Sequence, residues 1–292
     1  MKKVVVTGAN GFIGRNFIKY LRERNVEVFA IDISHEGSMF KDCEDVHLIC
    51  NSLENIKDLK EILSRENIDT FYHFAWAGTT GKARADYALQ SDNAKYTCDA
   101  AVLSKEIGTK KFVTTGTITE NVAQKTVSNN YCSENILYGL AKLYAHEMLH
   151  VISAKHDINY VWAKLSNIYG GDNTNGNLIS YTMGEFKNNK VPEYGPCEQP
   201  YNFTYIEDVL SALFLLGENK ESVGEYFVSN GECRKLKEYL REVAEHFQKE
   251  VAIGKREDDG VRYEEMWFNS SRLAEVGFQP QYTFSKGISM LK

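Results

Sequence analysis

The sequence predicts an α/β protein built on a doubly wound parallel sheet, followed by a smaller C-terminal α/β lobe. A short β-branched run at residues 4–6 leads through closely spaced glycines into an amphipathic helix. Apolar runs of strand length then alternate with helical periodicity as far as residue 165, which is typical of a parallel sheet with helices on both faces. The turn-rich run at residues 170–177 marks the point where this alternation loosens.

The first strand, its glycine turn and the following helix predict a dinucleotide site. Gly8, Gly11 and Gly14 recur at every third position, with the strand before them and the helix after them that such a turn requires. The bare backbone lets a pyrophosphate approach, and the helix start offers unpaired N–H groups to its negative charge. We therefore predict a Rossmann-type cofactor site here.

The second strand, at residues 26–32, ends on Asp32. Its spacing after the glycine turn is close to that of a carboxylate that hydrogen-bonds both hydroxyls of the adenosine ribose. Since this carboxylate would repel a 2′-phosphate, the sequence favours NAD over NADP. NADP stays an alternative because Arg15 and His35 lie nearby in the sequence.

Strands and helices continue to alternate after Asp32. Strands are predicted at residues 46–50, 70–75, 111–115 and 158–165, and helices at 53–63, 83–107 and 133–155. Ligands of such sheets bind at the carboxyl ends of the strands. The candidate positions are therefore Gly8, Asp32, Asn51 and residues 75–80, 115–117 and 167–169.

The C-terminal part is less regular. Helices are predicted at residues 178–188, 207–216, 235–247 and 270–276, a strand at 225–229, and a proline-containing loop at 189–203. We predict an NAD(P)-binding domain over residues 1–170 and a substrate-binding lobe over 171–292, with residues 207–230 returning to the first sheet.

Composition disfavours several kinds of partner. The chain is 43% hydrophobic and 25% charged, as in ordinary globular proteins. Its net charge of −6 disfavours a nucleic-acid partner, which would need a basic face. No apolar run is long enough for a membrane span or a signal peptide. The six cysteines are scattered and are typical of reduced thiols, so we expect a cytoplasmic protein.

The helix predicted at residues 133–155 carries two rival motifs. Tyr138 and Lys142 form a Tyr-x-x-x-Lys pair suited to proton transfer, and His146, Glu147 and His150 form a His-Glu-x-x-His zinc motif. Residues four apart on a helix point the same way, so both motifs are geometrically possible. Zinc also needs a third ligand and an open position, and zinc proteases do not begin with a dinucleotide fold. We therefore predict no metal and regard the histidines as helix-face residues.

Taken together, these motifs resemble the extended short-chain dehydrogenase/reductase family, which contains nucleotide-sugar epimerases, dehydratases and reductases. The resemblance covers residues 7–14, 73–75, Asn93, the Tyr138/Lys142 pair, and residues 165–170, 205–209 and 269–280. It implies NAD as cofactor and a nucleotide sugar as substrate. The implied cofactor contacts are Gly8, Asn10, Gly11, Phe12, Ile13, Gly14, Asp32, Asn51, Ser52, Phe74, Ala75, Trp76, Asn93, Thr115, Tyr138, Lys142 and Asn167.

The resemblance also implies roles for the catalytic residues. Tyr138 exchanges a proton with the substrate oxygen while hydride moves at the nicotinamide. Lys142 lowers the pKa of that tyrosine and hydrogen-bonds the nicotinamide ribose. Thr117, with Thr115 as the alternative, holds the substrate oxygen. Substrate contacts are expected from Thr79, Thr117, Asn167, Asn177, Leu178 and Tyr201.

Departures from the family pattern narrow the chemistry. In the 4,6-dehydratases of this family, Asp-Glu follows the threonine that corresponds to Thr117. In the 3,5-epimerase/reductases, a cysteine lies two residues after that threonine. This chain has Ile118 and Thr119 there. The Phe74–Gly78 segment, the turn at Thr117 and the Glu198-Gln199 pair resemble the branch that reduces 4-keto-6-deoxy nucleotide sugars.

Three functions stay open at this stage. Reduction of a 4-keto sugar is the favoured one, and 4-epimerisation with tightly held NAD is the main alternative. A non-catalytic NAD(P)-binding sensor is a third, although such proteins usually lose the tyrosine or the lysine that this chain keeps. The helices at residues 83–107 and 133–155 resemble those of a four-helix dimer contact in this family, so we expect a homodimer.

Overall fold

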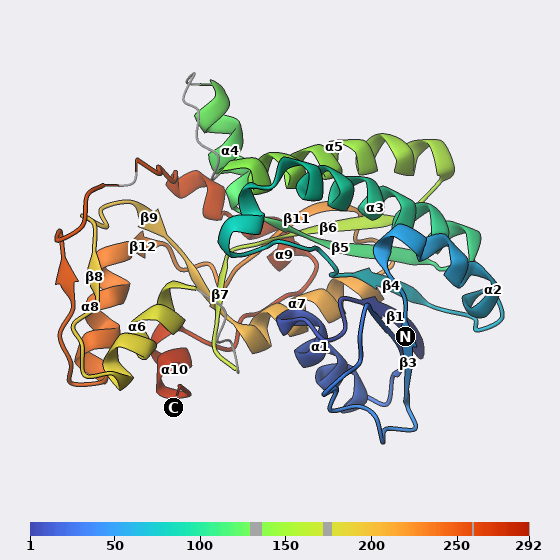
Figure 1. The fold of residues 1–292 in the computed structure, drawn as a ribbon, viewed down its shortest axis with the longest axis horizontal. Coiled ribbons are helices and arrows are strands. Elements are labelled where there is room, and N and C mark those ends of the chain that lie inside the picture. The colour runs from blue at the N-terminus through green and yellow to red at the C-terminus, as the bar shows by residue number, and fades with distance from the viewer. Residues whose placement is uncertain (129–135, 172–176, 259, 292) are drawn as a thin grey trace. The chain divides into compact units, whose positions relative to one another are not determined.

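The computed structural model describes residues 1–128, 136–171, 177–258 and 260–291, and it confirms the predicted α/β architecture (Figure 1). The chain forms two compact units. The first contains Met1–Lys164 and Leu210–Tyr226, and the second contains Leu165–Val209 and Phe227–Lys292. The chain therefore leaves the first unit near residue 164 and returns to it later for most of one helix and part of one strand.

A seven-stranded sheet in the order β11-β6-β5-β4-β1-β2-β3 organises the first unit. β1 pairs in parallel with both β2 and β4, so the strand order changes direction there and places a crevice at the carboxyl ends of these strands. The strands are β1 (Lys3–Thr7), β2 (Glu27–Asp32), β3 (Val46–Cys50), β4 (Thr70–His73), β5 (Lys111–Thr117), β6 (Tyr160–Leu165) and β11 (Gly224–Val228).

Helices cover both faces of this sheet. In Figure 1 the helices α3 (Tyr87–Glu106) and α5 (Leu137–His156) lie along one face, with α4 (Thr119–Ser128) beside them. On the other face lie α1 (Phe12–Arg22) and α7 (Ile206–Glu218). Apolar side chains between the sheet and α3 and α5 form a fully buried core that includes Phe71, Phe112, Ala145, Leu149 and Trp162.

Several helices differ from the prediction. α3 begins at Tyr87 because the Asp86 side chain caps it by accepting the N–H groups of Ala88 and Leu89. The residues before it form the 3₁₀ turn η2 (Gly81–Ala85). The stretch at residues 53–63 divides into the 3₁₀ helix η1 (Leu53–Leu59) and the short α2 (Lys60–Leu63). We did not predict α4, because its short, polar sequence lacks a clear apolar stripe. Part of the predicted helix, residues 133–135, lies outside the described residues.

The second unit combines small sheets with short helices around an aromatic core. Tyr169, Phe203, Tyr239 and Phe284 pack with ring centroids about 5 to 6 Å apart. β7 pairs with β10, β9 with β12 and β8 with β13. The elements are β7 (Asn167–Tyr169), α6 (Leu178–Lys187), β8 (Glu193–Tyr194), β9 (Pro200–Tyr201), β10 (Phe203–Tyr205), β12 (Arg234–Lys235), α8 (Leu236–His246), β13 (Ala252–Ile253), η4 (Glu265–Phe268), α9 (Ser271–Glu275) and α10 (Phe284–Ser289).

Two features of the second unit depart from the prediction. The proline-containing stretch at residues 189–203 holds the short strands β8 and β9, and the helix α10 was not predicted. Across the described part of the chain, we find no helix with the length and apolar character needed to cross a membrane.

Candidate active site

The turn after β1 consists of glycines because the surrounding backbone leaves no room for side chains. Gly8 has a φ of +70°, and a Cβ there would lie 2.8 Å from the backbone nitrogen of Ala75. A Cβ on Gly14 would lie 2.1 Å from the carbonyl oxygen of Gly8. The turn therefore lies directly against the residues after β4 and the start of α1, as a pyrophosphate site requires.

Asp32, the last residue of β2, is fixed by two backbone N–H groups. Its Oδ2 accepts the N–H of Asn10 at 2.9 Å, and its Oδ1 accepts the N–H of Ile33 at 2.8 Å. Each carboxylate oxygen keeps further acceptor capacity. This geometry fits the predicted recognition of a ribose diol beside the glycine turn.

A cavity of about 530 Å³ opens at the carboxyl ends of the strands. It brings together the predicted cofactor residues Gly8, Asn10, Gly11, Asp32, Asn51, Ser52, Phe74, Ala75, Trp76 and Asn93. Ala77, one of the candidate positions at residues 75–80, also lines it. The sequence missed several lining residues, namely Thr7, Ile31, Ile33, Leu53, Glu54, Leu89 and Tyr96. The other predicted cofactor residues, Phe12, Ile13, Gly14, Thr115, Tyr138, Lys142 and Asn167, do not line it.

Two asparagines of this cavity use their amides differently. The Oδ1 atom of Asn51 is buried and has no hydrogen-bond partner within the described residues, so a ligand N–H can satisfy it. The Asn93 amide exchanges two hydrogen bonds with the backbone of Ala77, both at 2.9 Å, and donates a third to the carbonyl of Leu89. Asn93 therefore fixes the loop after β4, and its predicted contact with a cofactor stays a prediction.

Thr117, Tyr138 and Lys142 come together where β5 ends and α5 begins. Thr117 and Tyr138 share a side-chain hydrogen bond. The buried Lys142 ammonium donates to the carbonyl of Thr115 at 2.8 Å and lies 3.8 Å from the centre of the Trp76 ring. That ring meets Tyr138 edge to face, with centroids 6.1 Å apart. Because Trp76 also lines the cavity, it connects the predicted catalytic residues with the predicted cofactor site.

Burial changes the proton affinity of both catalytic side chains. It raises the pKa of Tyr138 to about 12, while the Arg84 guanidinium and the hydrogen bond with Thr117 lower that pKa. Burial lowers the pKa of Lys142, and the Glu120 carboxylate opposes this change. Tyr138 therefore holds its proton at neutral pH, as the donor to a substrate oxygen must.

Arg84 is a neighbour of the catalytic tyrosine that the sequence did not predict. Its guanidinium lies 4.4 Å from the centre of the Tyr138 ring and 3.5 Å from the Thr119 hydroxyl, which in turn lies 2.6 Å from the Thr117 hydroxyl. The carbonyl of Thr79, a predicted substrate contact, accepts a hydrogen bond from the same guanidinium at 3.3 Å. Arg84 lies in η2, where neither strand nor helix periodicity singled it out.

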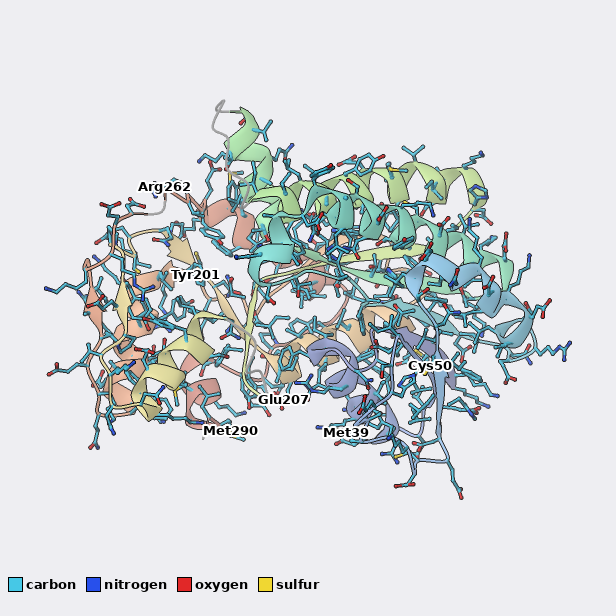
Figure 2. The ribbon with its side chains drawn as sticks, viewed as in Figure 1. Met39, Cys50, Tyr201, Glu207, Arg262 and Met290 are labelled. Carbon is cyan, nitrogen blue, oxygen red and sulfur yellow. The ribbon has the colours of Figure 1, made fainter. Side chains whose placement is uncertain are left out.

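The other predicted substrate residues belong to the second unit. The Tyr201 hydroxyl donates to Oδ1 of Asn167 at 2.8 Å, so the structure brings these two together (Tyr201 is labelled in Figure 2). The Asn177 side chain accepts the N–H of Ser180 and thereby caps α6, whose first residue is Leu178. Their contact with a substrate stays a prediction.

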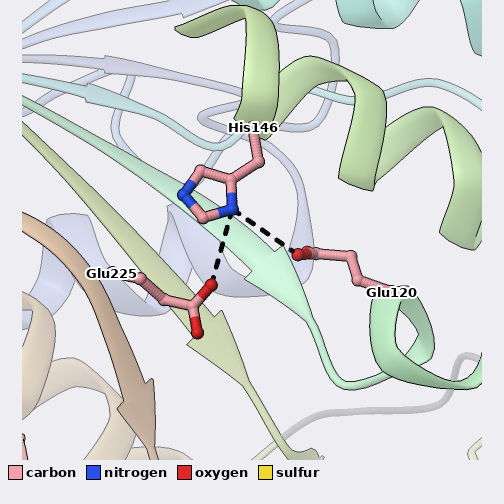
Figure 3. Close-up of side chains that lie close together, drawn as sticks. All are labelled: Glu120, His146 and Glu225. Carbon is pink, nitrogen blue, oxygen red and sulfur yellow. Dashed lines mark ion pairs between the residues drawn. The ribbon is translucent and has the colours of Figure 1, made fainter. Parts of the chain in front are cut away.

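His146 points into a cluster of charged side chains (Figure 3). Its Nδ1 lies 3.4 Å from Glu225 and 4.0 Å from Glu120, and its ring stacks on Trp162 with centroids 4.6 Å apart. Its side chain is only 13% exposed, so this face of α5 packs against charged partners that the sequence did not predict. These partners were missed because they come from distant segments.

This cluster has the composition of a metal site, but a lysine occupies it. Glu120, His146 and Glu225 offer ligand atoms within 4.8 Å of one another. The Lys164 ammonium lies 2.8 Å from Glu225 and 3.5 Å from Glu120, and it already supplies the positive charge that a metal would bring. His150 does not join the cluster; its Nδ1 lies 3.1 Å from the Tyr160 hydroxyl. The absence of a metal stays a prediction.

Comparison with known proteins agrees with this geometry. The model of the NAD dependent epimerase/dehydratase family matches residues 4–229. The chain is 24% identical to CDP-abequose synthase of Salmonella muenchen, over 99% of this chain and 97% of that protein. It is 23% identical to dTDP-4-dehydro-6-deoxyglucose reductase of Escherichia coli, over 99% and 96%. The solved UDP-glucuronic acid 4-epimerase of Bacillus cereus, in complex with UDP-glucuronic acid and NAD, has a TM-score of 0.80 at 20% identity, over 99% and 97%.

Proposed function

The chain belongs to the NAD dependent epimerase/dehydratase family, and we propose that it reduces the keto group of a 4-keto-6-deoxy nucleotide sugar with NADH. The observation that carries this proposal is the convergence of Thr117, Tyr138 and Lys142 near a cavity lined by the glycine turn, Asp32 and Trp76. Two relatives that align over nearly their whole length, the CDP-abequose synthase and the dTDP-4-dehydro-6-deoxyglucose reductase, support the substrate class.

The first unit contains the groups needed to hold NADH. The turn at Gly8 accepts the pyrophosphate, Asp32 accepts the adenosine ribose hydroxyls, and the buried Asn51 oxygen accepts an adenine N–H. When bound, NADH supplies a hydride to the carbonyl carbon of the sugar. The cavity fits this group because the glycine turn, the Asp32 carboxylate and the unpartnered Asn51 oxygen line it together.

The side chains at the start of α5 then supply the proton. Thr117 donates a hydrogen bond to the carbonyl oxygen, and the Tyr138 hydroxyl gives its proton to that oxygen as the hydride reaches the carbon. The product is an alcohol, and Tyr138 is left as a phenolate. The Lys142 ammonium and the Arg84 guanidinium stabilise this phenolate until it regains a proton from solvent.

The surroundings of Thr117 argue against dehydration. A dehydratase needs an acid and a base beside the sugar, but the nearest carboxylate after Thr117 is that of Glu120. Glu120 is 1% exposed and accepts the N–H groups of Thr117 and Trp162. Its carboxylate is therefore engaged within the protein.

We also propose a homodimer formed through α3 and α5. These helices pack together and expose apolar side chains, with Tyr87 74%, Tyr144 56% and Val151 66% exposed. Such side chains favour a protein contact over solvent. Light scattering after gel filtration would give twice the mass of the chain, and a monomer at micromolar concentration would contradict the proposal.

The proposed reaction is tested by mixing purified protein with NADH and a CDP- or dTDP-linked 4-keto-6-deoxyhexose. We expect one NADH oxidised for each keto group lost, followed at 340 nm. Inversion at C4 of a 4-hydroxy nucleotide sugar, without added NADH and by a protein purified with bound NAD, would instead favour the 4-epimerase. Binding of NADH without turnover on any keto sugar would favour the sensor.

A further inference from the structure

Glu120 is a buried acid directly behind the catalytic residues, and the proposed reaction does not use it. It lies in the first turn of α4, and its Oε1 accepts the backbone N–H of Thr117 at 2.7 Å. The indole N–H of Trp162 lies 3.2 and 3.3 Å from its two oxygens. Gly116 makes room for this arrangement, because a Cβ there would lie 2.6 Å from Glu120 and 2.0 Å from the Trp162 nitrogen.

Charged and titratable groups face this carboxylate from several elements. Lys164 of β6 lies 3.5 Å away, and His146 of α5 lies 4.0 Å away. Glu225 of β11 is the other acid of the cluster and is 39% exposed. Tyr138 and Lys142 of α5 both interact with Glu120 electrostatically. Arg84 lies against the ring of Tyr138, and the buried, neutral His73 of β4 interacts with Lys142.

The buried ammonium of Lys142 needs a negative charge nearby. A charge removed from water is costly unless an opposite charge compensates for it. Burial lowers the pKa of Lys142, and Glu120 is the group that opposes this change. Burial also disfavours the charged form of Glu120 and raises its pKa, while the positive charges of Lys164 and Lys142 lower that pKa.

We propose that Glu120 is a positioning residue that holds the backbone of Thr117 in place and keeps Lys142 protonated while Tyr138 transfers its proton. This inference rests on the proposed reductase site, and it adds the group that keeps the Lys142 side chain positively charged. Glu225 and Lys164 belong to the same network, and Glu120 also accepts the Thr117 N–H at the end of β5.

The test is the pH profile of kcat/KM for NADH-dependent reduction in the Glu120→Gln variant. Glutamine keeps an acceptor for the Thr117 and Trp162 N–H groups but removes the charge. Loss of that charge lowers the pKa of Lys142, so the fall of activity at alkaline pH should move to lower pH by about one unit. The matched control, Glu225→Gln, removes a carboxylate of the same cluster that does not contact Thr117, and should give a much smaller shift.

If the folded Glu120→Gln protein loses kcat/KM at the same alkaline pH as the wild type, the inference is overturned. If that variant does not fold, the carboxyl carbon of Glu120 can be followed by ¹³C NMR in the wild-type and Lys142→Met proteins. Its titration should move to higher pH when the ammonium is removed, and an unmoved titration equally overturns the inference. Full activity in Tyr138→Phe would instead refute the reductase site itself, so the two failures are distinguishable.

Discussion

The glycine turn after β1 and the start of α5 build two parts of one site by opposite means. The turn works through backbone, because Gly8 and Gly14 bring main-chain atoms so close that no side chain fits. The start of α5 works through buried charge, because Lys142, Glu120 and Lys164 lie close together away from water. Under the proposed function, the shape of the turn determines NADH binding, whereas proton transfer depends on buried charges that the fold must keep paired.

Among the variants that distinguish the two regions, Lys142→Met should have the largest effect. Turnover should fall by about 10²- to 10⁴-fold, because the proposed site loses the buried ammonium assigned to stabilise the phenolate of Tyr138. The free energy of unfolding should also decrease, because methionine leaves the Thr115 carbonyl without its donor and the buried Glu120 carboxylate with less positive charge around it. Steady-state kinetics and chemical denaturation measure both effects.

The matched control for Lys142→Met is Lys155→Met, which removes an exposed lysine of the same helix. It should leave turnover unchanged. Equal turnover in the two variants would contradict the role assigned to Lys142.

Gly14→Ala should act on the turn and on NADH binding. Its Cβ would meet the Gly8 carbonyl oxygen at 2.1 Å, so the turn must move. We expect a loss of about 3 kcal/mol in the free energy of unfolding, and loss of NADH binding. Gly184→Ala is the control, since a Cβ there meets nothing within 4 Å, and it should not be destabilising. A Gly14→Ala protein that binds NADH normally would show that the turn tolerates a side chain.

Asp32→Ala should have the smallest effect of the three variants, and this effect should be limited to NADH binding. Loss of two charge-assisted hydrogen bonds to the ribose should weaken NADH binding about tenfold or more. The preference for NADH over NADPH should shrink at the same time, because the repulsion of a 2′-phosphate is lost. Fluorescence titrations measure both constants, with Asp42→Ala as an exposed acidic control. An unchanged preference would remove Asp32 from cofactor selection.

The same contrast explains what the sequence could predict. The strands, the glycine turn and Asp32 follow from short local patterns, and the structure places them in one cavity. The start of α3 was predicted too early because Asp86 caps the helix inside a stretch whose apolar spacing already looks helical. α4 was missed altogether, and with it the position of Glu120.

The charge network could not be read from local patterns. Glu120, His146, Lys164 and Glu225 come from four elements, and they meet because β6 and β11 are neighbours in the sheet and α4 packs against α5. Arg84 likewise reaches Tyr138 from a 3₁₀ turn that the sequence analysis assigned to the following helix. The His-Glu-x-x-His motif shows the risk of local reading, since its two histidines have different partners in the fold.

The central claim is that Tyr138 gives the proton that completes hydride transfer to a keto sugar nucleotide. Tyr138→Phe keeps the ring that packs against Trp76 and Arg84 and removes only the hydroxyl. Turnover of NADH with the 4-keto substrate should fall by about 10²- to 10⁴-fold, while the dissociation constant of NADH stays close to that of the wild type. A Tyr138→Phe protein that reduces the substrate at the wild-type rate would contradict the account.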